Sequence, residues 1–88
     1  MVENIHPVEF YGLSTCIHCK HTREFLEKHG QKFDLHYVDQ LEGEERAEAL
    51  ETVKQYNPQI SFPTIIIDSG KKVVIGFKPE EMEEALEL

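Results

Sequence analysis

The sequence predicts a small α/β domain, built on a four-stranded mixed sheet with helices on both faces. Its 88 residues suit one domain, here taken as residues 1–88. Short β-type runs and amphipathic helical patterns follow one another in the order β-α-β-α-β-β-α. Two strands joined through a helix should be parallel with a right-handed crossover, whereas two strands joined by a short turn should be antiparallel.

The first part of the chain predicts one strand and one helix. Residues 1–7 are expected to be a flexible N-terminus that leads into a strand over Val8–Tyr11. A helical pattern follows over Ile17–His29, and Thr15 is a good N-cap residue, which would place Cys16 at the first helical position. One face of this helix is expected to contain Cys19, Thr22, Phe25, Leu26 and His29.

The middle of the chain predicts a second strand and a second helix. Gly30 suits the position just after the first helix. The run Phe33–Val38 begins with alternating apolar and polar residues, as a strand does, and Glu44–Tyr56 has a helical pattern that Asn57–Pro58 ends. The inner face of this helix is expected to contain Ala47, Leu50, Val53 and Tyr56.

The last part of the chain predicts a β-hairpin and a final helix. The strand Thr64–Ile67 holds three consecutive isoleucines, which indicates a central strand buried on both faces. Asp68–Lys71 is a turn into the next strand, Lys72–Ile75. Pro79 suits the first position of a helix that runs to Leu88.

Composition and charge restrict the partners and the compartment. The formal net charge of −8 disfavours nucleic acid and anionic membranes as partners. The acids concentrate in Glu42–Glu51 and Glu80–Glu87, which are read as solvated helix faces. The longest aliphatic run is three residues, and the start resembles no signal peptide, so we expect a cytoplasmic protein with no membrane segment.

Cys16 and Cys19, the two cysteines of the chain, form a Cys-x-x-Cys pair at a strand-to-helix junction. Thiols at this spacing can close a disulfide, and the positive end of a helix stabilises a thiolate, the nucleophile of thiol–disulfide exchange. In a reducing compartment the pair predicts redox chemistry. Two other interpretations are two inert buried thiols and half of a zinc site.

His18 lies between the cysteines and has two interpretations. It can be an exposed helix residue without effect, or it can stabilise the Cys16 thiolate by charge or by a hydrogen bond. His21 is read as a surface residue.

The element order, with Cys-x-x-Cys before the first helix and a proline before the third strand, resembles the thioredoxin fold. The detailed pattern is similar to the glutaredoxins of that superfamily. Three segments carry the resemblance, which covers about residues 8–88: Phe10–Cys19, Ser61–Thr64 and Ile75–Glu80. The resemblance implies a dithiol thiol–disulfide oxidoreductase, a small electron carrier that reduces protein or glutathione mixed disulfides and binds no cofactor. The same resemblance keeps open the alternative that these cysteines hold an iron–sulfur cluster shared by two chains.

The resemblance also implies roles for single residues. Cys16 matches the exposed nucleophile and Cys19 the buried resolving thiol. Pro63 matches a cis-proline beside the dithiol, and the backbone of Phe62 matches the group that pairs with a bound peptide or glutathione. Gly76 matches the start of a Gly-Gly segment that holds glutathione. The substrate-binding residues expected on this basis are Thr15, His18, Phe62, Pro63, Gly76 and Phe77.

Four departures from the glutaredoxin pattern concern the reductant. Leu13 replaces a usual lysine, Ile17-His18 replaces Pro-Tyr or Pro-Phe, Phe77 replaces the second glycine, and Pro79-Glu80 replaces an Asp-Asp pair. The Gly-Phe-x-Pro-Glu turn resembles the redoxins that serve ribonucleotide reductase and accept electrons from thioredoxin reductase. The expected reductant is therefore either glutathione or a donor of the thioredoxin-reductase type. The other expected partners are disulfide-containing proteins, and the protein is expected to be a monomer.

Overall fold

The structure is a computed structural model that describes residues 6–88, and it confirms the α/β class and the predicted element order. The sheet order is β2-β1-β3-β4; β1 and β2 are parallel, and the other two pairings are antiparallel. The elements are β1 (Val8–Gly12), α1 (Ile17–Lys28), β2 (Asp34–Tyr37), the 3-10 turn η1 (Val38–Gln40), α2 (Gly43–Tyr56), β3 (Thr64–Ile67), the 3-10 turn η2 (Asp68–Gly70), β4 (Lys72–Ile75) and α3 (Pro79–Leu86).

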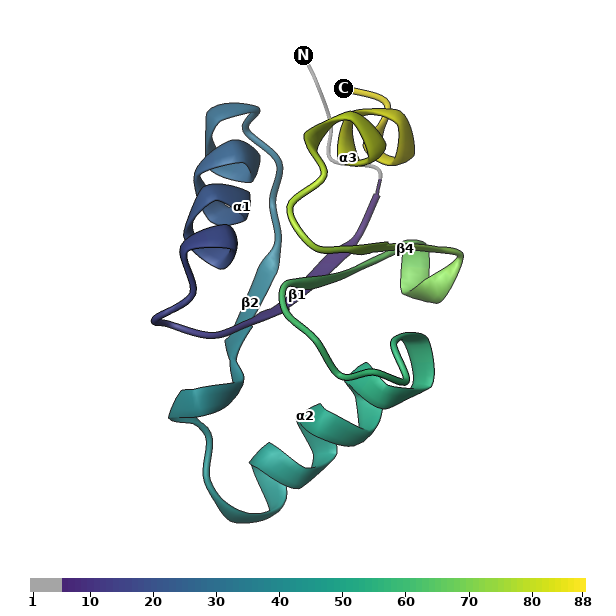
Figure 1. Ribbon diagram of the computed structural model, residues 1–88. Helices are drawn as coiled ribbons and strands as arrows, with labels where there is room; N and C mark the ends of the chain where they lie inside the picture. The colour runs from purple at the N-terminus through teal and green to yellow at the C-terminus, as the bar shows by residue number, and fades with distance from the viewer. Residues whose placement is uncertain (1–5) are drawn as a thin grey trace.

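Helices cover both faces of the sheet, as Figure 1 shows: α1 and α3 lie on one face and α2 on the other. Each face has its own hydrophobic core. The core under α1 and α3 contains Phe10, Leu26 and Met82, each fully buried. The core under α2 is smaller and contains Val38 and Val53. The two cores meet at β3, whose four residues are all buried, so the isoleucine run correctly predicted a central strand.

The start of α1 differs from the prediction. Cys16, not Thr15, is the N-cap, with φ −86° and ψ 124°, and Ile17 is the first helical residue. The cysteine sulfur takes the place that a serine or threonine oxygen usually takes, because it accepts a hydrogen bond from the Cys19 amide. The two thiols therefore lie at the cap and in the first turn of α1.

The end of α1 follows the prediction closely. Gly30 has φ +67°, and its amide bonds the carbonyl of Glu27 while the amide of Gln31 bonds the carbonyl of Leu26. This pair of hydrogen bonds is a Schellman motif, which favours glycine at this position because its left-handed backbone disfavours a Cβ atom.

The prediction for the inner face of α2 is wrong at one residue. Ala49 and Val53 are buried, Leu50 and Tyr56 are half-buried, and Ala47 is exposed. Ala47 and Ala49 differ by 200° around an ideal helix, and alanine is too small to reveal in the sequence which of the two faces the sheet.

Other bounds differ by a few residues. β2 lacks the predicted Phe33 and Val38, and α3 ends at Leu86, with Glu87 in the left-handed region at φ 58°. Of the N-terminal segment that was expected to be flexible, residues 1–5 lie outside the described residues. His6 is described, and its imidazole lies 2.9 Å from an Asp68 oxygen and 3.0 Å from a Glu87 oxygen.

Candidate functional site

The strand register brings three of the predicted segments to one end of the sheet. Tyr11 pairs with Thr64, and Thr64 pairs with Ile75. Because these strands are antiparallel, the residues one step further on are Gly12, Pro63 and Gly76. The amide of Gly76 donates to the carbonyl of Pro63 over 2.8 Å. The loop with Cys16 starts from the same end, directly after Gly12.

Cys16 is the accessible thiol. Its side chain is half-buried against the core under α1 and α3. The Cys16 amide donates to the carbonyl of Leu13 over 3.2 Å, and its sulfur accepts from the Cys19 amide over 3.4 Å. That donor stabilises negative charge on the sulfur. The position at a helix N-terminus acts in the same direction.

Cys19 is the inaccessible thiol, with 1% of its surface exposed. Burial raises the pKa of the Cys19 thiol to about 12, and the neighbouring Cys16 acts in the same direction. The amide of Leu13, which donates to the Cys19 sulfur over 3.4 Å, opposes this rise in pKa. Gly12 allows the close approach, because a Cβ atom there would lie 3.1 Å from the Cys19 sulfur.

The other predicted site residues differ in how exposed they are. Thr15 and His18 are exposed, and Phe62 and Phe77 are half-buried. The Phe62–Pro63 peptide bond is cis, as the resemblance implied. The ring of Phe77 packs against α1, with its centroid 5.7 Å from that of His21 and 6.3 Å from that of Phe25. His21 is on the surface, as predicted, and is also part of this aromatic group.

Sequence reasoning missed Asp39, which was assigned only to a link between elements. Its carboxylate accepts hydrogen bonds from both the amide and the hydroxyl of Ser14, two residues before Cys16. These hydrogen bonds hold the pKa of Asp39 below its usual value. The sequence signal was weak because the partners are 25 residues apart, and only the register of β1 and β2 brings them together.

No group of three or more histidine, cysteine or acidic side chains in residues 6–88 is arranged to hold a metal ion. Within the same part of the chain, no helix combines the length and apolarity needed to cross a bilayer.

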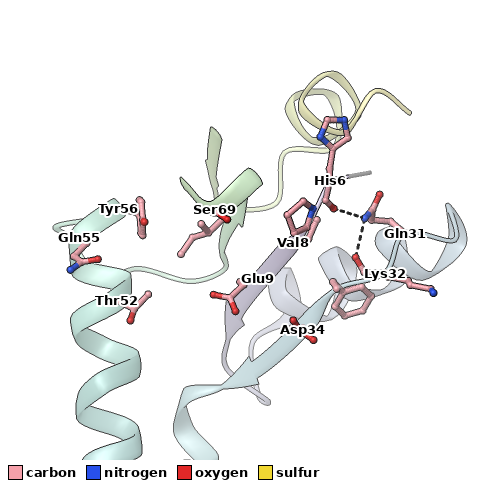
Figure 2. Close-up of a pocket in the computed structure, with 13 residues that line it drawn as sticks. His6, Val8, Glu9, Gln31, Lys32, Asp34, Thr52, Gln55, Tyr56 and Ser69 are labelled. Carbon is pink, nitrogen blue, oxygen red and sulfur yellow. Dashed lines mark hydrogen bonds between the residues drawn. The ribbon is translucent and has the colours of Figure 1, made fainter. Parts of the chain in front are cut away.

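A cavity of about 860 Å³, drawn in Figure 2, lies at the end of the sheet where β1 begins. The loop with Cys16 follows the other end of β1. Glu9 and Asp34, a register pair on β1 and β2, face Thr52 and Tyr56 of α2 across it. None of the predicted site residues lines this cavity. The dithiol is therefore separate from this cavity.

Comparisons with known proteins agree with this geometry. The family model described as Glutaredoxin matches residues 8–73. No curated protein matches the chain.

Solved structures give a closer comparison. The glutaredoxin from Methanosarcina mazei Go1 is 49% identical, with a TM-score of 0.87 over 93% of this chain and 79% of that one. Methanosarcina acetivorans methanoredoxin is 41% identical, with a TM-score of 0.88 over 93% of this chain and 85% of that one. The glutaredoxin-like NrdH-redoxin from Escherichia coli is 26% identical, with a TM-score of 0.64 over 89% of this chain and 92% of that one.

The family match spans most of the chain, the two archaeal structures align over nearly all of it, and Cys16 and Cys19 form the Cys-x-x-Cys pair. The chain belongs to the glutaredoxin family, within the thioredoxin superfamily, and is a thiol–disulfide oxidoreductase.

Proposed function

We propose that Cys16 is the nucleophile and Cys19 the resolving thiol of a two-step reduction of disulfides in other proteins. One observation carries this assignment: Cys16 is partly exposed and its sulfur accepts an amide hydrogen bond, whereas Cys19 is buried with a pKa raised to about 12. A substrate disulfide can reach only the first of these sulfurs.

In the first step the Cys16 thiolate attacks one sulfur of the substrate disulfide. A new bond forms between Cys16 and that sulfur, the substrate disulfide breaks, and the other substrate sulfur leaves as a thiolate. The product is a mixed disulfide between Cys16 and the substrate.

In the second step Cys19 attacks the Cys16 sulfur. The Cys16–Cys19 disulfide forms, and the bond between Cys16 and the substrate breaks. The departing substrate thiolate takes up the proton that Cys19 gives up. The substrate disulfide has then gained two electrons, and the dithiol has lost two.

The surface around Cys16 is suited to protein substrates. Ile17, the next residue, is 54% exposed, and half-buried Phe62 and Phe77 lie in segments at the same end of the sheet. Exposed apolar side chains beside a reactive group favour contact with another protein. The substrate-binding set in this proposal is Thr15, His18, Phe62, Pro63, Gly76 and Phe77.

We take the reductant to be a donor of the thioredoxin-reductase type rather than glutathione. Leu13 and Phe77 replace the lysine and the second glycine that glutaredoxins usually have, and the Phe77 ring packs on α1. In addition, the 26% identical NrdH-redoxin is described as having a thioredoxin-like activity profile. We also propose that the protein is cytoplasmic and monomeric.

The test uses Cys19→Ser, with Cys16→Ser as the matched control. The reduced proteins are exposed to a peptide disulfide, quenched in acid and weighed by mass spectrometry. Cys19→Ser should accumulate a mixed disulfide on Cys16, because the resolving sulfur is absent, and Cys16→Ser should form none.

The same assay can test the reductant. The oxidised wild-type protein is offered either glutathione or thioredoxin reductase with NADPH, and fast reduction is expected only in the second case. If Cys16 of the Cys19→Ser variant stays free after exposure to the peptide disulfide, the two-step mechanism is refuted. Ready reduction through a glutathione adduct would refute the choice of reductant alone.

A further inference from the structure

The backbone of Leu13, in the loop of residues 12–16, makes one hydrogen bond to the sulfur of Cys19 and one to the amide of Cys16. The Leu13 amide donates to the Cys19 sulfur, and the Leu13 carbonyl accepts from the Cys16 amide. The amide and the carbonyl of Leu13 are therefore each hydrogen-bonded to one of the two cysteines. The position of this one peptide segment determines whether Cys19 has a hydrogen-bond donor.

Asp39 holds this loop from outside. Its Oδ1 accepts from the Ser14 amide over 3.0 Å, and its Oδ2 accepts from the Ser14 hydroxyl. Both donors belong to the residue that follows Leu13. Bonds to a charged acceptor are stronger than bonds between neutral groups.

Asp39 is itself well anchored. It lies in the η1 turn, directly after Val38, which is 2% exposed in the core under α2. The β1–β2 register ends with Gly12 opposite Tyr37, so the segments after these two strands leave the sheet side by side. They meet again two residues later, at Ser14 and Asp39. Figure 1 shows the loop before α1 and the segment after β2 at the same end of the sheet.

We propose that Asp39 is a positioning residue for the resolving step: its carboxylate fixes Ser14, and thereby holds the Leu13 amide on the sulfur of Cys19. This inference rests on the proposed role of Cys19. The amide stabilises the negative charge that Cys19 must carry when it attacks the Cys16 sulfur. Without the tether the loop has more conformations, and the donor is in place for less of the time.

The negative charge of Asp39 has a second, opposite effect. It is one of the causes that raise the pKa of Cys19, so it disfavours the thiolate. The tether and the charge can be separated by substitution. Asp39→Asn keeps an oxygen for the Ser14 amide but removes the charge, whereas Asp39→Ala removes both.

The experiment follows the two steps with dithiobis(nitrobenzoic acid), an aryl disulfide that releases one coloured thiolate at each step. Attack by Cys16 releases the first, and attack by Cys19 on the mixed disulfide releases the second. In Asp39→Ala we expect the second release to slow by roughly 2- to 10-fold, the range for one lost hydrogen bond, while the first changes little. Asp39→Asn should restore most of the rate of the second release.

The controls separate the possible failures. Glu42→Ala removes an exposed acid three residues away that caps no helix through its side chain, and should behave as wild type. Ser14→Ala removes only the hydroxyl donor and should show a smaller slowing. An Asp39→Ala second release as fast as that of Glu42→Ala, or an equal slowing of both releases, would overturn the inference. A second release that persists in Cys19→Ser would instead overturn the proposed function.

Discussion

A single helical turn separates an accessible sulfur from a buried one. Cys16 lies at the N-cap of α1, outside the first turn, and Cys19 lies inside it and faces the sheet. Burial removes Cys19 from water and favours its neutral form. The same spacing that allows a disulfide therefore also gives the two thiols different chemistry.

This difference predicts selective alkylation of the reduced protein. Burial raises the pKa of the Cys19 thiol to about 12, so the thiolate, which is the form that reacts, is scarce on Cys19 at pH 8. We expect iodoacetamide to modify Cys16 alone in the native protein, as read by peptide mass mapping. Cys16→Ser should be almost unreactive until denatured. Modification of native Cys19 before Cys16 would contradict the prediction.

At the scale of residues, the sequence indicated the identity of the two thiols but not the hydrogen bonds around them. The Cys-x-x-Cys spacing predicted a pair at a strand-to-helix junction, and the structure places Cys16 and Cys19 there, while their roles in the reaction stay a proposal. The cap was assigned to Thr15 because threonine caps helices often, yet the sulfur of Cys16 makes that bond. The tether between Asp39 and Ser14 could not be read from local spacing, because it depends on how β1 and β2 pair.

At the scale of elements, Asn57 connects the end of α2 to the segment that carries Pro63. Asn57 is 2% exposed, and its amide nitrogen lies 3.1 Å from the Ser61 carbonyl oxygen and 3.2 Å from the Thr64 hydroxyl oxygen. The Thr64 hydroxyl in turn donates to the Ser61 carbonyl over 2.7 Å. This network holds the turn between α2 and β3 in place, and with it the Phe62–Pro63 segment.

Asn57→Ala should therefore lower the free energy of unfolding by about 1–3 kcal/mol, because it removes the hydrogen bond to the Ser61 carbonyl and leaves the buried Thr64 hydroxyl oxygen without its donor. Urea unfolding followed by circular dichroism measures the change. The matched control is Thr52→Ala, which removes an exposed hydroxyl bond to the Glu48 carbonyl and should change the free energy by less than about 0.5 kcal/mol. Equal effects of the two substitutions would show that the Asn57 network contributes nothing special.

The elements also show why parts of the fold were predictable. Three consecutive isoleucines have no polar alternation, so β3 had to be buried on both faces, and it is. Gly30 and Pro79 gave correct helix limits because their backbone preferences are local. The inner face of α2 was predicted wrongly at Ala47, because a helix rich in glutamate with two nearby alanines has a weak apolar pattern. The buried alanine is Ala49.

At the scale of the whole molecule, charge is divided between the helices. The glutamates of Glu42–Glu51 and Glu80–Glu87 are all exposed, as their sequence pattern indicated, and they lie on α2, α3 and the residues next to them. On α1, which follows Cys16, the exposed charges are mixed: Lys20 and Lys28 are exposed, and so are Glu24 and Glu27. The acidic surface is therefore concentrated on elements other than the helix that carries the dithiol.

His6 joins three distant parts of the chain and gives stability a pH dependence. Its imidazole bonds Glu87 after α3 and Asp68 after β3, and these two carboxylates raise its pKa above 6.5. The folded state then holds the proton more tightly than the unfolded state, so the contribution is complete below about pH 6.5 and is lost as the pH rises through the raised pKa. We expect this pH-dependent stabilisation to be absent from His6→Gln. The midpoint of urea unfolding, measured from pH 5 to pH 9 for the variant and the wild type, checks this. An unchanged profile in His6→Gln would refute the contribution.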